Sequence, residues 1–335
     1  MIINKKIKSL FSFLFLICIF CLVFLGLSNK YKNDTYSNLN IKYTITEPYK
    51  YPVIPGTKEW NLLNDHQEMI DACYIEPEFL SKMTTEALVE TVITYPLFVD
   101  AFAYDTFDVG LQKISRYFAG IDELLSREDA YEVLEKFYNN SDLLVEGNYK
   151  TYISCLLRYI DNSFDNFRGL TYLPDTVLTP NNTAVAVYVG CDWDDWGYSQ
   201  SDVISIQTIN NAYVTTYNAS MLNSIDPSYN CHSYAWYQQS NNNKWMNDPS
   251  AYTSDGSYSA SYPVNGRKIT YNTVSNKTTS LEHSGIISLA GATIDSMYVT
   301  SKWGCGALFY HKAKKCPYYS DGVYNYTSFS YWKLN

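Results

Sequence analysis

The sequence predicts an α+β protein with an amino-terminal membrane segment, an all-helical domain and a carboxy-terminal α+β domain. Three observations support this prediction. An uncharged apolar run lies near the amino terminus, helical periodicity extends over about 57–164, and short strand-like segments separated by Gly, Asn and Asp follow residue 254. With 335 residues, of which 46% are hydrophobic, the chain can build a substantial core.

Residues 1–30 are expected to form a signal anchor or a signal peptide. Lys5, Lys6 and Lys8 precede an apolar run at 10–27, which is close to the minimum length of a helix that spans a bilayer. Positive charge before the run predicts a cytoplasmic amino terminus, with the bulk of the chain outside the cytoplasm. The absence of a small-residue cleavage motif favours a membrane anchor, whereas cleavage would give a secreted protein.

Residues 31–170 are expected to form an acidic, all-helical domain, whose role the sequence leaves open. Thr84 or Thr85 can cap the helix that Pro96 ends. Apolar residues recur at intervals of three and four, as in a helix with one buried face, in the segments 86–95, 109–118, 127–138 and 149–160.

The negative charge is concentrated in this helical part. Residues 31–170 carry 12 Lys and Arg against 23 Asp and Glu, whereas 171–335 carry 9 against 11. An acidic surface without a basic stripe argues against nucleic acid as a partner.

Cysteine usage gives no sign of a metal or cofactor. The cysteines beyond the apolar run have neither a CxxC motif nor clustered Cys and His spacing, so no metal and no other cofactor is expected. If any disulfide forms, Cys305 and Cys316 are the favoured pair.

Residues 196–335 are expected to form the α+β domain, after a linker and leading strand at 171–195. Helical periodicity stops at 171–183, where Pro, Asn and Thr become frequent, and this change places the boundary. A strand at 183–190 and a helix at 199–218 follow, and short Tyr-rich strands complete the domain.

Cys231 is the candidate nucleophile. The stretch CHSYAWYQQS predicts a helix that begins at or just before Cys231, so the helix dipole would stabilise a thiolate there. His232 is not the expected base, because neighbouring residues on a helix point about 100° apart. We expect His232 to have a structural role, either half-exposed on the helix or hydrogen-bonded to the preceding loop.

His283 is the expected base. It heads an apolar strand, and a turn near AGATID allows MYVTSKW to return antiparallel beside that strand. A cysteine on a helix that faces a histidine on the first strand of a sheet is the layout of papain-like hydrolases.

Ser301 is the expected orienter of His283. Strand parity places Ser301 on the same face as His283, whereas Lys302 has three donors and no acceptor for the ring N–H. A main-chain carbonyl is an alternative, and Asp295 and His311 are less favoured ones.

The remaining candidates concern the oxyanion hole and the cleft. The main-chain N–H of Cys231 is one donor, and Tyr229 or Asn230 can add a second, or act instead as a turn residue and a helix cap. Three tryptophans and one lysine are candidates for a cleft wall, although buried Trp more often belongs to a core: Trp236, Trp245, Trp303 and Lys302.

CHSYAW resembles the Cys-x-x-Tyr-Ala-Trp beginning of CHAP domains, the cysteine, histidine-dependent amidohydrolases and peptidases. HSGIIS is similar to the His-led strand of that family, and KWMNDPSAY fits the same order. The likeness covers about residues 220–310. It implies a papain-like α+β fold, attack of Cys231 on an amide carbonyl, proton transfer to His283, and peptidoglycan stem peptides as a substrate class. The Glu, Asp or Asn that usually orients the family's histidine is missing here, where Lys302 stands.

The leading hypothesis is therefore an extracytoplasmic thiol hydrolase that cleaves an amide bond in cell-wall peptide. Two alternatives stay open: a non-catalytic surface or adhesion module on a papain-like scaffold, and a protease or isopeptidase acting on exported proteins. A functional Cys231 is expected to react with iodoacetamide well below pH 8, before the other thiols.

Overall fold

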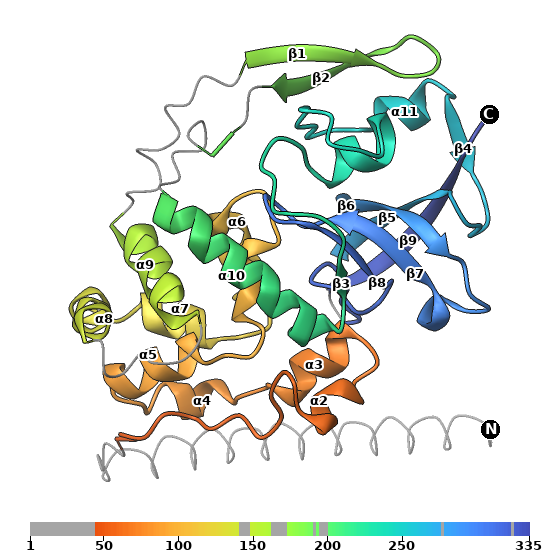
Figure 1. Ribbon diagram of the computed structural model, residues 1–335. Helices are drawn as coiled ribbons and strands as arrows, with labels where there is room; N and C mark the ends of the chain where they lie inside the picture. Colours follow the sequence, from red (N-terminus) through yellow and green to blue (C-terminus); the bar gives the residue numbers. More distant parts are fainter. Residues whose placement is uncertain are drawn as a thin grey trace, which may run out of the picture. The chain divides into compact units, whose positions relative to one another are not determined.

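The structure is a computed structural model, in which residues Ile45–Asn335 form one compact unit (Figure 1). The predicted membrane segment at residues 1–30 lies outside the residues that the structure describes. Within the described part of the chain, no helix has both the length and the apolar character that a membrane span needs. The described residues are 44–140, 148–161, 173–189, 192–193, 200–275, 278–322 and 325–335.

The fold is α+β, as the sequence predicts, and its sheets are antiparallel. Seven strands form the main sheet, in the order β3-β8-β7-β6-β5-β9-β4, and β1 and β2 form a separate hairpin. The strands are β1 Leu173–Leu178, β2 Ala184–Val189, β3 Ser220–Met221, β4 Tyr258–Ala260, β5 Lys268–Ser275, β6 Thr278–Leu289, β7 Tyr298–Lys302, β8 Leu308–Lys312 and β9 Asn325–Leu334.

Short helices make up the first part of the described chain. Thr84 caps α5 by accepting a hydrogen bond from the Ala87 main-chain N at 3.3 Å, so the predicted helix start is confirmed. The elements are α2 Lys58–Asn61, α3 His66–Ala72, α4 Pro77–Leu80, α5 Thr85–Ile93, η1 Phe98–Phe102, α6 Phe107–Ile114, α7 Gly120–Leu125, α8 Ala130–Asn139, α9 Tyr149–Ile160, α10 Gln200–Tyr217, η4 Ser233–Tyr237, α11 Ala251–Ser254 and η5 Ile294–Ser296.

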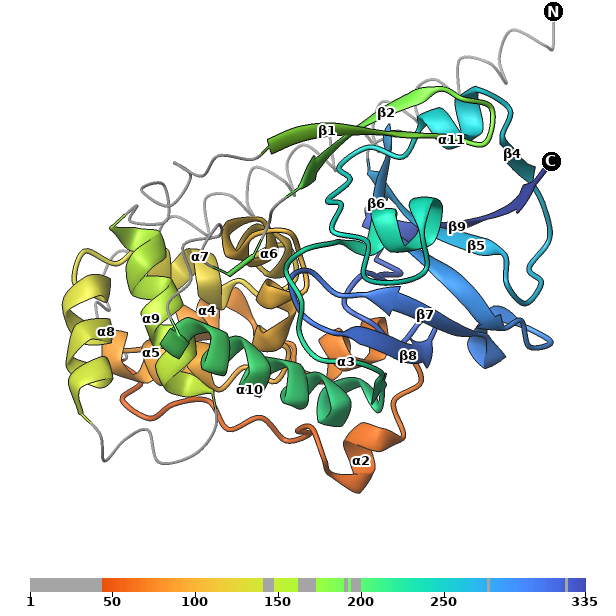
Figure 2. The same ribbon diagram turned by 45° about the horizontal axis from the view of Figure 1, so that its top comes forward.

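One hydrophobic core joins the helices to the sheet. Leu88 and Phe98 from the helical part belong to the same buried cluster as Val299 and Phe309 from the sheet. The long helix α10 runs along this junction (Figures 1 and 2), and its Tyr213 hydroxyl donates to the main chain of η1 at 2.8 Å. Residues on both sides of 171–195 therefore contribute to one core.

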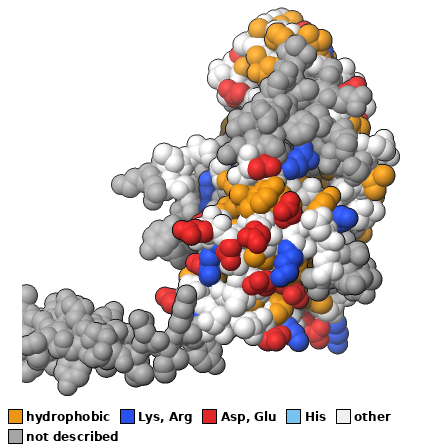
Figure 3. All heavy atoms as spheres, turned by 90° about the vertical axis from the view of Figure 1, so that its left-hand side faces the viewer, with side chains coloured by type: hydrophobic (Ala, Val, Ile, Leu, Met, Phe, Trp, Pro, Cys, Tyr) orange, Lys and Arg blue, Asp and Glu red, His pale blue; other side chains and the backbone are white. Residues whose placement is uncertain are grey.

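The face of the helical part seen in Figure 3 carries acidic side chains interspersed with Lys and Arg. Hydrophobic side chains also reach the surface there, and basic side chains do not gather into a stripe on this face.

The hairpin β6–β7 has the predicted pairing. Ile287 lies opposite Val299, so Ser301 and His283 belong to the same face of the sheet, with Gly285 between them in register. A Cβ at Gly285 would lie 2.6 Å from Val299 Cγ1, so only glycine fits this close approach of the two strands.

The helical turn at 231–237 begins at Cys231, as the sequence predicts. Two α-helical residues are followed by the π-helical segment η4, which contacts β6 and β7. Asn230 caps the turn: its Oδ1 accepts from the Ser233 main-chain N at 3.1 Å, and its own N donates to Ser233 Oγ at 3.3 Å. These reciprocal hydrogen bonds fix the position of Cys231 at the start of the turn.

Candidate active site

Cys231 and His283 line the same cavity, which we call the Cys231 cavity. Its volume is about 200 Å³. The turn at 231–237 supplies one of the two residues and the middle of β6 supplies the other, so the fold brings together the predicted nucleophile and base. The other lining residues are Ala103, Tyr104, Asp105, Val109, His232, Asn247, Leu281, Glu282, Gly304 and Tyr318.

The Cys231 sulfur is almost buried, with 8% of the residue exposed. Burial raises the pKa of the thiol to about 12, and the negative charge of Asp105 acts in the same direction. The main-chain N–H groups of Ser284 and His232 point at the sulfur and favour the thiolate. Because burial outweighs these donors, Cys231 rests as a neutral thiol at pH 7.

The imidazole of His283 is fully buried, and neither ring nitrogen has a hydrogen-bond partner among the described residues. Burial, followed by the neighbouring charges of His311 and His232, holds the pKa of His283 well below its usual value. The ring is therefore neutral at pH 7 and has one nitrogen free to accept a proton.

Aromatic packing orients the His283 ring. The Tyr318 ring stacks on it with centroids 3.6 Å apart, and Tyr271 lies edge-on at 5.4 Å. Each tyrosine is itself anchored through its hydroxyl, Tyr318 to the Ala103 carbonyl and Tyr271 to the Ala313 carbonyl. Ring contacts thus hold the imidazole without a hydrogen-bonded acceptor.

Ser301, the expected orienter, uses its hydroxyl elsewhere. His311 Nε2 lies 2.8 Å from Ser301 Oγ, and Trp303 Nε1 donates to the same oxygen at 3.1 Å. His311 Nδ1 lies 2.9 Å from the Lys312 carbonyl, which can only accept, so Nδ1 carries the proton and the Ser301 hydroxyl donates to Nε2. Ser301 therefore shares the face of His283, as predicted, but is hydrogen-bonded to His311.

Of the two less favoured orienters, Asp295 is exposed and forms an ion pair with Lys314 at 3.0 Å. His311 is buried behind Ser301, where burial lowers its pKa to about 4. Neither residue lines the Cys231 cavity.

Lys302 is a structural clamp. Its ammonium is buried and donates to three carbonyls, those of Asp226 at 2.6 Å, Gly304 at 3.0 Å and Gly306 at 2.6 Å. The contact ties the loop before Cys231 to the loop after β7, and Gly304 itself lines the cavity. Burial lowers the pKa of Lys302 to about 8.

The side chains of Tyr229 and Asn230 face structural partners rather than the cavity. The Tyr229 hydroxyl accepts from Asn223 Nδ2 at 3.0 Å. Asn230, besides capping the turn, donates to the Met246 carbonyl at 2.8 Å. The donors found at the sulfur are main-chain N–H groups, those of His232 and Ser284, which favour the thiolate.

The three tryptophans are buried, and none lines the Cys231 cavity. Trp303 packs between α10 and β8, where its ring lies 5.0 Å from that of Tyr213 and 4.4 Å from that of Phe309. Trp236 donates to Ser284 Oγ at 3.0 Å, and Trp245 pairs with β2 through the main chain of Tyr188.

His232 is buried rather than half-exposed, and its partner is not the preceding loop. Its Nδ1 lies 2.9 Å from Ser284 Oγ, on the strand that carries His283. Burial lowers the pKa of His232 to about 4, so the ring is neutral. The expected exposure and the expected partner were both wrong, because the side chain points towards the sheet, and His232 also lines the Cys231 cavity.

Several lining residues have no signal in the sequence. Tyr104 and Asp105 come from the loop after η1, and Tyr318 comes from the segment after β8. Glu282 could have been suspected because it precedes His283, and Asn247 because it lies in KWMNDPSAY. Long-range packing places Tyr104, Asp105 and Tyr318, and no local pattern marks them.

Other expectations concern cysteines and metals. Cys305 and Cys316, the favoured pair, are not joined by a disulfide, and Cys316 Sγ donates to the Ala313 carbonyl at 3.5 Å. The described residues include no group of three or more His, Cys, Asp or Glu arranged to hold a metal ion.

No protein-family model, no curated protein and no solved structure matches this chain. The function of the chain is therefore inferred from its own residues and from the geometry of the Cys231 cavity.

Proposed function

We propose that the protein is a thiol hydrolase on a papain-like scaffold, which cleaves an amide bond through Cys231 with His283 as the base. The observation that carries the proposal is that the two side chains line one cavity and that the His283 nitrogens have no partner among the described residues. A buried imidazole without a hydrogen bond is costly to stability, and an acid–base role explains its retention.

A general-base mechanism needs a neutral imidazole, which His283 has at rest, whereas burial of the Cys231 thiol opposes its deprotonation. A neutral imidazole can take the thiol proton as the sulfur attacks the carbonyl carbon, and the N–H groups of Ser284 and His232 favour the negative charge that develops on the sulfur. The imidazolium then returns its proton to the leaving amine as the C–N bond breaks, which leaves a thioester on Cys231. Water, deprotonated by His283, hydrolyses the thioester and regenerates the thiol.

The substrate class proposed is cell-wall peptide, from the likeness of CHSYAW and HSGIIS to CHAP domains. The predicted membrane segment at residues 1–30 would hold the enzyme on the outer side of the cytoplasmic membrane. An exported protein is the alternative substrate, because the same chemistry cleaves any accessible amide.

The test compares Cys231→Ser and His283→Gln with a control, Cys155→Ser, which changes a thiol outside this cavity. Purified peptidoglycan and an unfolded protein are incubated with each variant, and the products are identified by mass spectrometry. We expect both site variants to lose activity by at least about a thousandfold, with the control unchanged. Undiminished cleavage by Cys231→Ser would contradict the proposal.

A non-catalytic binding module is the second candidate. The observations that favour it are the neutral, buried Cys231 thiol and the lack of a hydrogen-bonded orienter for His283 among the described residues. On this alternative the wild-type protein cleaves neither substrate, yet it sediments with peptidoglycan as well as the Cys231→Ala variant does.

A further inference from the structure

A second cavity shares a wall with the Cys231 cavity. We call it the Arg116 cavity; its volume is about 230 Å³, and Tyr104, Glu282 and Tyr318 line both cavities. Pockets for drug-sized ligands measure roughly 300–1,000 Å³, so this one suits a single residue of a larger substrate. The shared wall includes Tyr318, whose ring stacks on His283.

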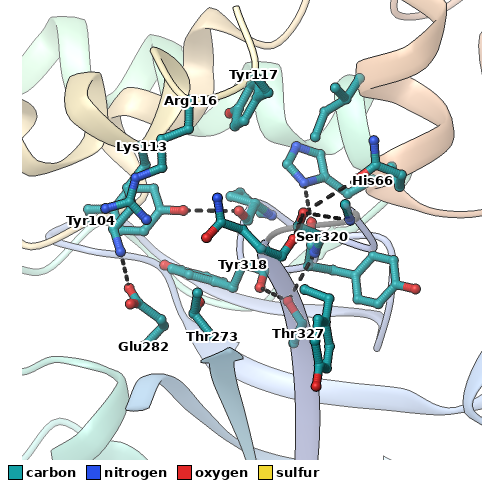
Figure 4. A pocket seen from close by; sticks show the side chains of 17 residues that line it. His66, Tyr104, Lys113, Arg116, Tyr117, Thr273, Glu282, Tyr318, Ser320 and Thr327 are labelled. Carbon is teal, nitrogen blue, oxygen red and sulfur yellow. Dashed lines mark hydrogen bonds and ion pairs between the residues drawn. The ribbon is translucent and has the colours of Figure 1, made fainter. Parts of the chain in front are cut away.

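The charges of the Arg116 cavity are unequal. Lys113 forms an ion pair with Glu282, which leaves these two neutral together. Arg116 is exposed and has no carboxylate within 4 Å among the described residues. Figure 4 shows Arg116, Lys113, Tyr104 and Glu282 grouped at one end of the cavity, opposite His66 and Ser320. This end therefore carries an excess positive charge, although residues 31–170 are strongly acidic.

The hydroxyls of two aromatic wall residues, Tyr104 and Tyr117, are already engaged. The Tyr104 hydroxyl donates to the Pro317 carbonyl at 3.1 Å, and the Tyr117 hydroxyl donates to Asp100 Oδ2 at 3.1 Å. These walls offer ring surface for an aliphatic stem, and Arg116 is the charged lining residue without a carboxylate within 4 Å among the described residues, so it can select a polar end. A guanidinium binds a carboxylate through two parallel N–H donors.

We infer that the Arg116 cavity is a subsite for a carboxylate-bearing residue of the peptide substrate, held beside the amide that Cys231 attacks. The link to catalysis rests on the proposed hydrolase function, whereas the binding itself does not. The carboxylate has two possible sources, an acidic side chain within the peptide or the free carboxyl end of the chain.

The test measures binding without turnover. Full-length Cys231→Ala protein is titrated calorimetrically with three blocked or free tripeptides: one with a central glutamate and an amidated end, the same with glutamine, and an all-alanine peptide with a free carboxyl end. We expect the glutamate peptide, the free-carboxyl peptide or both to bind about tenfold more tightly than the glutamine peptide. The stronger of the two identifies the source of the carboxylate.

Arg116→Gln, added to Cys231→Ala, should abolish that preference. Arg116→Lys should keep part of it, because the positive charge remains but the two parallel N–H donors are lost. Arg267→Gln, which removes an arginine that lines neither cavity, should leave the preference unchanged. Equal binding of the glutamate, glutamine and free-carboxyl peptides, or a preference that survives Arg116→Gln, would overturn the inference. If wild-type protein cleaves no amide while Cys231→Ala still prefers the carboxylate peptide, the hydrolase proposal is refuted and the subsite is supported.

Discussion

The His283 imidazole lies parallel to the Tyr318 ring, with centroids 3.6 Å apart and planes inclined by 7°. This stack places a residue from the segment after β8 against the predicted base on β6. Under the proposed mechanism, this stacked ring would hold the imidazole in one orientation, the task that a hydrogen-bonded carboxamide or carboxylate performs in papain-like sites.

Replacing Tyr318 should therefore affect turnover through ring orientation. Tyr318→Phe keeps the stacked face, and we expect its hydrolysis rate to stay within about threefold of wild type. Tyr318→Leu removes the face and should lower kcat by about ten- to a hundredfold with KM little changed, because the imidazole is no longer aligned. Steady-state kinetics on a cleaved peptide separate the two variants. Equal hydrolysis rates for Tyr318→Phe and Tyr318→Leu would show that stacking does not position His283.

Ser301→Ala tests the other candidate orienter. Because the Ser301 hydroxyl donates to His311 and accepts from Trp303, its loss should cost about 1–3 kcal/mol of unfolding free energy and change the hydrolysis rate by less than about threefold. Urea denaturation and kinetics on the same preparation check both parts. If the hydrolysis rate fell by much more than the loss of folded protein accounts for, Ser301 would have a role in catalysis.

The local part of this site was predictable from the sequence, and the long-range part was not. The start of the helical turn at Cys231 and the pairing of β6 with β7 follow from capping residues and alternation, which act between near neighbours. Strand parity also placed Ser301 correctly on the face of His283. The hydrogen-bond partner of Ser301 on that face is His311, on the neighbouring strand β8. Strand parity alone does not decide between His283 and His311.

The role of Lys302 was likewise not predictable from the sequence. Its position near the candidate base suggested a lost orienter, because lysine offers no acceptor. The structure gives it three carbonyl partners from the loop before Cys231 and the loop after β7, an arrangement set by the fold as a whole. Tyr318 and Asp105 reach the cavity in the same long-range way, so no spacing in the sequence marks them.

The buried thiol predicts slow alkylation of Cys231, contrary to the expectation of fast labelling below pH 8. With the pKa raised to about 12, the thiolate fraction and hence the iodoacetamide rate should rise about tenfold per pH unit from pH 7 to 10 without a plateau. Peptide mapping by mass spectrometry follows Cys231 and the half-buried Cys155 in one experiment. A plateau of the Cys231 rate below pH 8 would mean that a thiolate is stabilised there. Slow labelling of Cys231 at neutral pH would agree with the non-catalytic alternative, which the neutral, buried thiol favours.

Acid should destabilise the protein through its buried neutral histidines. The pKa of His311 is about 4 when folded and about 6.5 when unfolded, so between these values the unfolded chain binds a proton that the folded chain does not. The unfolding free energy should consequently fall as pH drops from 6.5 to 4, by on the order of 3 kcal/mol for this residue.

His311→Gln keeps an acceptor for Ser301 and should remove that share of the pH dependence. His232→Asn should do the same for His232, whose pKa is also about 4. Urea denaturation at several pH values measures the slopes, and a slope in His311→Gln equal to that of wild type would show that His311 is protonated in the folded state.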